Sequence, residues 1–337
     1  MGVIKIGIIG TGRIARRFVP ECGKVNGTRV TSVYNPHFES AKRFANEFGL
    51  DAYDDIDNFY SGLDAVYVAA PHELHISYIR SALLAGKHVI SEKPMSFSVA
   101  DSKEVFVMAE DHGLVLMEGI KTFYCPGFTR VISLVKEGAI GQVVNVEACF
   151  TKLVEADSRE MTDLKYGGSF TELGSYVMLA LLEFLGPDVE KWDFNFDSIK
   201  NDNNIDIFTR LSVKVVDMVE DGTDTKLGCG FCGLGAKSDG SLIIAGTSGY
   251  IRVRAPWWLT SHIEVHHEDP TQIESYEEEF LGDGLRYEIN EFVNAIAGDE
   301  AALIKLDTAK DYSMGITWIM ERFLRSRCLL YGNVVVW

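Results

Sequence analysis

Apolar and polar positions follow two different periods along the first 120 residues. Short continuous apolar runs, typical of strands buried on both faces, alternate with stretches in which apolar residues recur at the three- and four-residue spacing of an amphipathic helix. The expected strands are 4–9, 29–34, 65–69, 88–91 and 114–117, and the expected helices are 14–22, 39–48, 74–85 and 99–112. Such alternation with short connections predicts a doubly wound parallel sheet, the Rossmann type of α/β domain.

The pattern changes in the second half, where long strands follow one another. Strands are expected at 143–152, 207–219, 226–234, 241–245, 250–254 and 262–267, and helices at 168–185, 287–297 and 307–325. Asp221-Gly222 and Asp239-Gly240 are typical of hairpin turns. We therefore expect a C-terminal α+β domain with a large open, mainly antiparallel sheet. Pro126-Gly127 punctuates the chain and indicates a boundary between domains 1–122 and 123–337.

Composition narrows the function classes. The 337 residues are 47% hydrophobic and 24% charged, as in ordinary soluble globular proteins. The formal net charge of −17 argues against a nucleic-acid partner, because phosphate binding needs clustered lysine and arginine. No apolar run reaches the roughly 18 residues of a membrane span, and the first residues have no signal-peptide pattern. Six scattered cysteines indicate a reducing, cytoplasmic location, and the isolated pair Cys229 and Cys232 does not predict a metal site.

Residues 10–15 read Gly-Thr-Gly-Arg-Ile-Ala, a G-x-G-x-x-A pattern between the first expected strand and the first expected helix. In that context Gly10 permits the tight turn, and Gly12 lets a pyrophosphate approach the backbone. The phosphates then lie at the helix N-terminus, where free N–H groups favour anions. The pattern predicts dinucleotide binding by Gly10, Gly12, Arg13 and Ile14, with a plain tight turn as the alternative.

The end of the second strand leaves the choice between NAD and NADP open. An Asp or Glu there usually binds the ribose of NAD, whereas this chain has Tyr34-Asn35-Pro36-His37. Asn35 can hydrogen-bond either ribose, and Arg13 can supply charge to a 2′-phosphate. Because no carboxylate repels that phosphate, the pattern favours NADP.

The segment Ser91-Glu92-Lys93-Pro94 ends a strand with an ionisable pair before a proline. Ligands of open α/β sheets bind beyond the carboxyl ends of the strands, so Glu92 and Lys93 are expected at the ligand. Lys93 can donate a hydrogen bond to a substrate oxygen and stabilise developing charge, and Glu92 can orient it. Pro94 holds the turn, and we expect a cis Lys93-Pro94 bond. Taken alone, the tripeptide is equally compatible with a surface Glu-Lys pair.

With these segments in place, the chain resembles the Gfo/Idh/MocA oxidoreductases. The resemblance rests on GIIGTGRIA, VYVAAPHELH and AGKHVISEKP, and it extends over most of the chain through EGIKTFYCPGFTRVISLVKEGAIGQV and GLRYEINEFVNAI. It implies a Rossmann domain that binds NAD or NADP, 1–122, and a substrate-binding and oligomerisation domain, 123–337. It also implies that Lys93 contacts the nicotinamide ribose and the reacting substrate oxygen, and that the second sheet packs against another subunit in a homodimer or homotetramer.

A second segment with catalytic character contains Glu172 and Tyr176, four residues apart on one face of an expected helix. The sugar and inositol dehydrogenases that the chain resembles carry an Asp and a His at these positions, and the dihydrodiol dehydrogenase branch carries a tyrosine at the second. Tyrosine has an unperturbed pKa of about 10, so Tyr176 suits proton donation to a carbonyl oxygen and needs a nearby cation, for which Lys93 is the candidate. The alternatives are an ordinary helix tyrosine and a structural Glu172.

Further candidates lie near the ends of expected strands. Pro71 and His72 are expected to line the cofactor site, whereas His75 is expected to be a structural hydrogen-bonding residue. Trp257 and Trp258 are expected either in the core of the sheet or at a subunit interface, and the enrichment of aromatic residues at interfaces favours the second. The candidate substrate ligands, each with a solvated side chain as the alternative, are Lys121, Lys152 and Arg159.

Together with these patterns, the resemblance implies an NAD(P)-dependent oxidoreductase that transfers a hydride between nicotinamide and a CH–OH or C=O carbon of a sugar, polyol or cyclic diol. Lys93 would act on the substrate oxygen with Tyr176 as proton relay, assisted by Glu172. The alternative is a non-catalytic NAD(P)-binding sensor or regulator, favoured by the missing Asp and His and disfavoured by the presence of Lys93. No individual substrate follows from the sequence. The C-terminal LLYGNVVVW has no assigned function, and an added edge strand is one interpretation of it.

Overall fold

The computed structural model describes residues 2–219 and 222–329. Over these ranges the chain forms two compact units, each built from two separate stretches of sequence. Residues 2–124 and 281–317 form the first unit, and residues 125–280 and 318–329 form the second. The predicted boundary at 122/123 is close to the first crossing after Tyr124. It does not include the return of residues 281–317 to the first unit. In the sequence, these helices directly follow the strands of the second unit, so the pattern assigns them to it.

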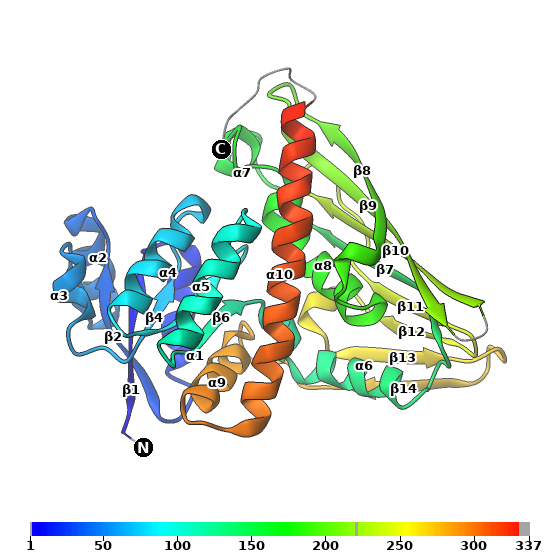
Figure 1. The fold of residues 1–337 in the computed structure, drawn as a ribbon, viewed down its shortest axis with the longest axis horizontal. Helices are drawn as coiled ribbons and strands as arrows, with labels where there is room; N and C mark the ends of the chain where they lie inside the picture. Colours follow the sequence, from blue (N-terminus) through cyan, green and yellow to red (C-terminus); the bar gives the residue numbers. More distant parts are fainter. Residues whose placement is uncertain (1, 220–221, 330–337) are drawn as a thin grey trace. The chain divides into compact units, whose positions relative to one another are not determined.

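The first unit is built on a six-stranded sheet, drawn with its helices in Figure 1. In order across the sheet, the strands are β3 (Asp51–Tyr53), β2 (Thr28–Tyr34), β1 (Ile4–Ile9), β4 (Ala65–Val68), β5 (His88–Glu92) and β6 (Leu116–Gly119). Its helices are α1 (Arg13–Cys22), α2 (Phe38–Phe48), α3 (Ile56–Tyr60), α4 (His75–Leu84), α5 (Val99–Asp111), α9 (Leu285–Ile296) and the first part of α10 (Glu300–Leu329). All neighbouring pairs are parallel, which confirms the predicted doubly wound Rossmann sheet.

Burial on both faces explains why these strands are continuous apolar runs. Every side chain of β4 is buried, and in β1 only Lys5 is exposed. A Cβ at Gly7 would lie 2.3 Å from Leu63, so glycine lets the segment after α3 pack directly on the strand. Because the strands are parallel, the carboxyl ends of β1, β4, β5 and β6 all open onto one edge of the sheet.

The second unit is built on an eight-stranded sheet, also seen in Figure 1. Its strands, in order, are β14 (Ile273–Glu277), β13 (His262–His266), β12 (Tyr250–Val253), β11 (Leu242–Gly246), β7 (Val143–Thr151), β10 (Gly222–Gly233), β9 (Asp206–Val219) and β8 (Trp192–Lys200). Within the described strands of this second sheet, only β7 and β10 pair in parallel, and all other neighbours are antiparallel. This confirms the predicted mainly antiparallel sheet. The helices are α6 (Pro126–Lys136), α7 (Arg159–Thr162), α8 (Ser169–Leu185) and the last part of α10.

Two sequence signals of the second unit had different outcomes. The hairpin expected at Asp239-Gly240 is wrong, because β7 lies between β10 and β11 in the sheet. In contrast, β9 and β10 pair antiparallel with Val219 opposite Gly222, as the Asp221-Gly222 signal predicts, although Asp221 itself lies outside the described residues. Residues 330–337, most of the LLYGNVVVW segment, also lie outside them.

Helix α8 packs on one face of the second sheet, against β7, β9 and β10. Glycines in β10 allow this close approach: a Cβ at Gly230 would lie 2.1 Å from Cγ1 of Val177, and one at Gly228 would lie 2.6 Å from Leu185. The opposite face carries exposed apolar side chains, among them Val216, Met218, Leu227, Tyr250 and Ile273. The second sheet therefore has one face covered by a helix and one partly apolar face that is open in the monomer.

Helix α10 is the longest described helix, with 30 residues. Its first turns belong to the first unit, and its last turns belong to the second. Within the described ranges, no helix combines the length and the apolarity needed to cross a bilayer.

Candidate functional site

The carboxyl edge of the first sheet collects most of the predicted cofactor residues. The glycine loop follows β1, residues 69–72 follow β4, Lys93 follows β5, and Lys121 follows β6. The predicted residues that lie at or next to these strand ends are Gly10, Gly12, Arg13, Ile14, Asn35, Pro71, His72, Glu92, Lys93 and Lys121. Strand direction alone therefore brings together residues that are up to 111 positions apart in the sequence.

The glycine loop has the shape that a pyrophosphate needs. Gly10 has φ of +105°, and a Cβ there would lie 2.4 Å from the carbonyl oxygen of Ala69. Gly12 is the N-cap of α1 and makes no side-chain cap, and no atom lies within 4 Å of its Cβ position. Arg13, exposed, and Ile14, half-buried, form the first turn. The loop thus offers an open helix N-terminus with backbone N–H donors, which fits a dinucleotide phosphate.

Asn35 lies directly after β2 and ties this strand end to the glycine loop. Its Nδ2 donates to Oγ1 of Thr11 at 3.0 Å, and its Oδ1 accepts the backbone N–H of His37 at 2.9 Å. The amide is therefore fixed beside the loop. Its contact with a ribose stays a prediction.

The turn that carries Lys93 is held by buried polar contacts. The Lys93-Pro94 bond is cis, as predicted. The backbone N–H of Met95 donates to Oε1 of Glu118 at 2.8 Å. Lys93 itself is half-buried. The turn thus presents a lysine while its own backbone is anchored to the end of β6.

His75 anchors the same turn from the other side, which confirms its structural assignment. It is fully buried, and its Nδ1 and Nε2 lie 2.9 Å from the carbonyl oxygens of Pro94 and Ala70, respectively. Burial lowers the pKa of His75. His72, at the start of the short helix after Pro71, packs edge-on against His75 with ring centroids 5.6 Å apart. The ends of β4 and β5 are therefore locked together, and the role of His72 and Pro71 toward a cofactor stays a prediction.

The buried carboxyl groups of Glu92, Glu118 and Glu288 lie in or against β5 and β6 of the first unit, and we call them the buried acid cluster. Oε1 of Glu92 accepts the hydroxyl of Tyr67 at 2.5 Å. Burial raises the pKa of Glu92, while the charges of Lys93 and Lys121 oppose this rise. Burial raises the pKa of Glu118 to about 7. The edge next to Lys93 thus holds carboxyl groups that retain protons to unusually high pH.

Glu118 and Glu288 were not predicted from the sequence, although each left a signal. Glu118 is a carboxylate inside a buried strand, as Glu92 is. Glu288 lies within the apolar stripe of α9 formed by Leu285, Ile289 and Phe292. A charged residue at a core position of a helix pattern indicates either an ion pair or a functional role.

Lys121, a predicted substrate ligand, is engaged inside the first unit. Its Nζ donates to the carbonyl oxygen of Asp283. Its charge also opposes the rise that burial causes in the pKa of Glu92 and Glu288. A contact with substrate stays a prediction for Lys121, and the structure gives it neighbours within the buried acid cluster.

In the second unit, α8 presents Glu172 and Tyr176 together. Between Ser169 and Leu182 they are the only residues of α8 that are not buried. Arg159, predicted as a substrate ligand, donates from Nη2 to Oε1 of Glu172 at 2.7 Å. Two predicted site residues are therefore partners of each other, and Arg159 is an orienting group for Glu172 in this arrangement.

Tyr176 lies beside an aromatic pair of the second unit. Its ring centroid is 5.2 Å from that of Phe150, which stacks on Trp258 at 3.6 Å. Trp257 is fully buried and donates from Nε1 to the carbonyl oxygen of Cys149 at 2.9 Å, so the interface assignment is wrong for Trp257. Lys152, the third predicted substrate ligand, follows β7 and is exposed.

The start of α8 is fixed by Asp206, the fully buried first residue of β9. Its Oδ2 accepts the backbone N–H of Phe170 at 2.8 Å, and its Oδ1 lies 3.5 Å from Nη1 of Arg327. Arg327 also donates to the carbonyl oxygen of Gly167 at 2.9 Å. Gly168 has φ of +116°, and a Cβ there would lie 2.1 Å from Oδ1 of Asp206. The Gly-Gly sequence and one buried ion pair thus set the first turn that carries Glu172.

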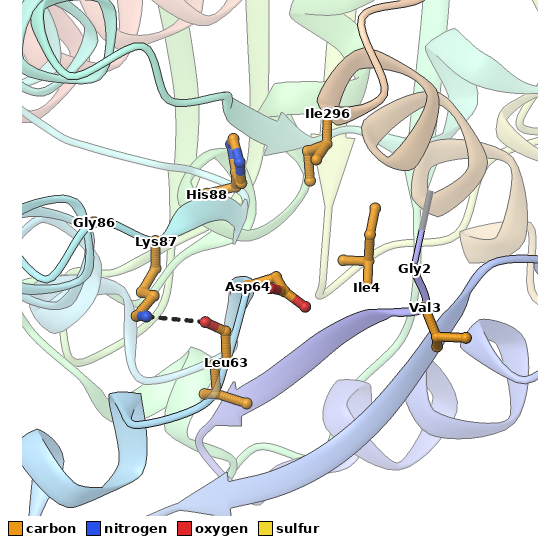
Figure 2. A pocket seen from close by; sticks show the side chains of 9 residues that line it. All are labelled: Gly2, Val3, Ile4, Leu63, Asp64, Gly86, Lys87, His88 and Ile296. Atoms are coloured by element: carbon orange, nitrogen blue, oxygen red, sulfur yellow. Dashed lines mark hydrogen bonds between the residues drawn. The ribbon is translucent and has the colours of Figure 1, made fainter.

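A pocket at the opposite, amino edge of the first sheet is shown in Figure 2. It is lined by Gly2, Val3, Ile4, Leu63, Asp64, Gly86, Lys87, His88 and Ile296. Nζ of Lys87 is bound to the carbonyl oxygen of Leu63 at 2.9 Å, and Nδ1 of His88 accepts the backbone N–H of Val115 at 2.9 Å. These groups complete the strand ends, and none of the predicted cofactor residues lines this pocket.

Comparison with known proteins shows that this chain is similar to oxidoreductases. Residues 4–120 match the model of an oxidoreductase family with an NAD-binding Rossmann fold. A dTDP-3,4-didehydro-2,6-dideoxy-alpha-D-glucose 3-reductase from Actinomadura kijaniata is 34% identical over 192 residues, which cover 56% of this chain and 58% of that relative. The chain thus matches little more than half of the length of this relative. A protein of the same name from Saccharopolyspora spinosa is 30% identical over 234 residues, 68% of each chain.

A solved structure extends the likeness to nearly the whole fold. KijD10, a 3-ketoreductase from Actinomadura kijaniata in complex with TDP-benzene and NADP in an open conformation, has a TM-score of 0.77. The identity is 23%, and the match covers 93% of this chain and 95% of KijD10. At this identity the likeness supports the fold, with both units present.

Replacing Asp206 by asparagine tests how the start of α8 is held. Asp206→Asn keeps the shape but leaves the buried Arg327 guanidinium without its carboxylate, so we expect a loss of about 3–5 kcal/mol in the free energy of unfolding. The measurement is urea denaturation followed by circular dichroism. Asp217→Asn is the control, because Asp217 pairs with Lys191 at the surface and its loss should cost at most about 1 kcal/mol. Equal small losses in both variants would contradict the assignment.

Proposed function

The chain belongs to the Gfo/Idh/MocA family of oxidoreductases, and we propose that it transfers a hydride between a nicotinamide dinucleotide and a CH–OH or C=O carbon of a sugar, polyol or cyclic diol. One observation carries the proposal. Lys93, half-buried, follows the carboxyl end of β5, on a turn anchored by His75 and Glu118. The named sugar 3-reductases among the relatives support the substrate class.

In this proposal each residue acts through its position and charge. The bound nicotinamide supplies or accepts the hydride. Lys93 donates a hydrogen bond to the substrate oxygen and stabilises the charge that develops there, or takes its proton in the reverse direction. Tyr176 relays the proton, and Glu172, held by Arg159, assists it. The open glycine loop with Gly10 and Gly12 holds the pyrophosphate.

Lys93→Ala tests the catalytic assignment. We expect turnover to fall by about 10²–10⁴-fold, the usual contribution of a positioned acid–base group, while the dissociation constant of the cofactor changes only several-fold. The measurement is cofactor absorbance across a panel of sugars, polyols, diols and their keto forms, with cofactor binding followed by fluorescence. Tyr176→Phe should also lower turnover, because it removes the hydroxyl that relays the proton and keeps the rest of the ring.

Lys87→Ala is the matched control for Lys93→Ala, since Lys87 precedes the amino end of the same strand, β5. It should leave turnover unchanged. Unchanged turnover in Lys93→Ala would remove Lys93 from the mechanism. Tight cofactor binding without turnover on the whole panel would favour the sensor alternative.

The cofactor is proposed to be NADP rather than NAD. No Asp or Glu lies among the first four residues after β2, and the exposed Arg13 begins α1, directly after the glycine loop to which Asn35 is hydrogen-bonded through Thr11. The structural relative KijD10 is described in complex with NADP. Arg13 would meet the 2′-phosphate.

Arg13→Ala tests this choice. A hydrogen bond to a charged group contributes about 1.5–3 kcal/mol, so the dissociation constant for NADP should rise roughly 10- to 100-fold while that for NAD stays within about threefold. Isothermal titration calorimetry with both cofactors measures it. Arg29→Ala, at the amino end of β2, makes the same charge change as a control. Equal weakening of NAD and NADP binding would rule out a specific phosphate contact.

A homodimer or homotetramer formed through the open face of the second sheet completes the proposal. Leu227 is 48% exposed on that face, and strand pairing connects it through one cross-strand row to Tyr250 and Ile273. Exposed apolar side chains gathered on one face of a sheet are typical of an interaction surface.

Leu227→Glu tests this interface. A carboxylate buried without a partner in a subunit contact is costly, so we expect a lower molar mass in size-exclusion chromatography with light scattering, with NADP binding retained. Leu303→Glu is the control, because Leu303 is 41% exposed on α10 in the first unit. A molar mass that is the same for both variants and the wild type would exclude this face as the interface.

A further inference from the structure

Glu288 is a buried carboxyl group that the proposed mechanism does not use. Its side chain is fully inaccessible, and neither carboxyl oxygen has a hydrogen-bond partner among the described residues. Both oxygens lie 3.5 Å from the Cβ position of Gly119, the residue paired with Glu92 across β5 and β6. The group is therefore aimed at the strand pair that ends in the Lys93 turn.

The charged and titratable groups around Glu288 come from three elements. Glu92 acts on it from β5, Lys121 acts on it from the segment after β6, and Tyr124 lies at the end of that segment. The charge of Lys93 opposes the rise in the pKa of Glu92 and of Glu118, and the charge of Glu92 adds to the rise in the pKa of Glu118. Burial, and next the negative charge of Glu92, raise the pKa of Glu288 well above its usual value, while Lys121 opposes the rise. Burial and the charge of Glu92 thus both favour the neutral acid form of Glu288.

Glu92 and Glu288 differ in their hydrogen-bond partners and in the cations near them. Glu92 accepts a hydrogen bond from Tyr67 and has Lys93 and Lys121 as cationic neighbours. Glu288 has no donor on either oxygen among the described residues. Of two neighbouring carboxyl groups that cannot both ionise cheaply, the one with donors and cations keeps the negative charge. The proton therefore belongs to Glu288.

Glu21, on α1, is a buried carboxylate that is fully paired by a residue of α9, the helix that carries Glu288. Its two oxygens accept the guanidinium and the backbone N–H of Arg286, two residues before Glu288 on α9. These contacts and the charge of Arg286 outweigh burial and lower the pKa of Glu21. Glu288 has no such arrangement, so it costs stability that a glutamine or an apolar side chain would save.

We infer that Glu288 is a positioning residue that stores one proton beside Glu92 and exchanges it, through Glu92, with Lys93 during turnover. The inference rests on the proposed oxidoreductase function. It assigns a role to a residue that has no direct contact with substrate or cofactor in that proposal.

The proton balance in carbonyl reduction is as follows. The substrate carbon receives the hydride, and its oxygen takes a proton that leaves the Lys93 ammonium, directly or by way of Tyr176. The Glu92 carboxylate takes the proton of Glu288 and passes one proton on to the Lys93 amine, so Glu92 ends the step as a carboxylate again. The Glu288 carboxylate then regains a proton from water before the next turnover, and alcohol oxidation runs the same transfers backward.

A stability measurement tests the stored proton without any turnover. A carboxyl group whose pKa is raised by folding loses stability as the pH rises from the unfolded value of about 4.3 toward the folded one. Glu288→Gln removes this loss, so its melting midpoint should exceed that of the wild type at pH 8 by at least about 2 °C. The difference should shrink toward zero near pH 4.

Glu21→Gln is the matched control with the opposite sign. The pKa of Glu21 is lowered by folding, so the variant should melt below the wild type at pH 8, and the deficit should shrink as the pH falls toward 4. Infrared difference spectra of wild type minus Glu288→Gln should contain a protonated carboxyl band at pH 7. A Glu288→Gln variant less stable than the wild type at pH 8, or a carboxylate band in its place, overturns the inference.

Kinetics test the exchange. Glu288→Gln should lower kcat roughly 10- to 100-fold, at the lower end of the range for acid–base groups, with KM and cofactor affinity nearly unchanged. Glu288→Asp should recover part of kcat, and Glu21→Gln should keep the wild-type kcat and its pH profile. A Glu288→Gln variant with wild-type kcat from pH 5 to 9 overturns the exchange. If the wild type turns over no substrate, the proposed function and the exchange both fail, while the pH-dependent stability still decides whether Glu288 stores a proton.

Discussion

The arrangement of the first unit depends on how the backbone of the Lys93 turn is hydrogen-bonded. A turn at the end of a buried strand exposes polar backbone groups to a low-dielectric interior, and each must find a partner. His75 supplies one of these partners from the first turn of α4, and Glu118 supplies another from β6. Leaving one such group unsatisfied typically costs about 1–3 kcal/mol. The backbone of the Lys93 turn is therefore fixed by the neighbouring elements. Because it is already ordered, it loses little conformational freedom when a ligand binds.

The same edge concentrates unfavourable electrostatics. Three buried carboxyl groups and two lysines share it, and burial dominates the pKa of each acid. In an ordinary core such groups would be replaced by apolar side chains or fully paired, as Glu21 is with Arg286. Carboxyl groups whose pKa is raised by burial are typical of sites that move protons, and their persistence next to Lys93 fits such a site. In the second unit, the helix that carries Glu172 and Tyr176 is positioned largely by apolar packing. Helix α8 packs closely on glycines of β10, and Tyr176 lies against Phe150.

The sequence predicts the first unit far better than the second. Parallel strands buried on both faces are continuous apolar runs, and the glycine loop and the Lys93 turn are short-range patterns whose place at one edge follows from strand direction alone. The order of the second sheet could not be predicted, because Asp239-Gly240 reports a local turn whereas the pairing of β7 between β10 and β11 is a long-range choice. The Glu172–Arg159 pair and the Asp206–Arg327 pair were missed for the same reason. Glu288 was missed because one polar residue in an apolar helical stripe has no meaning until its neighbours are known.

The division of both units into separate stretches of sequence has a consequence for synthesis on the ribosome. Domains usually fold in the order in which they emerge. Here the first unit lacks α9, and therefore the Arg286 partner of Glu21, until the strands of the second unit have been made. The second unit in turn lacks Arg327, which completes the start of α8, until almost the entire described chain has emerged. The first unit is complete only when residue 317 has emerged, and the second only after Arg327, so the nascent Rossmann sheet must persist without its late helices through most of translation.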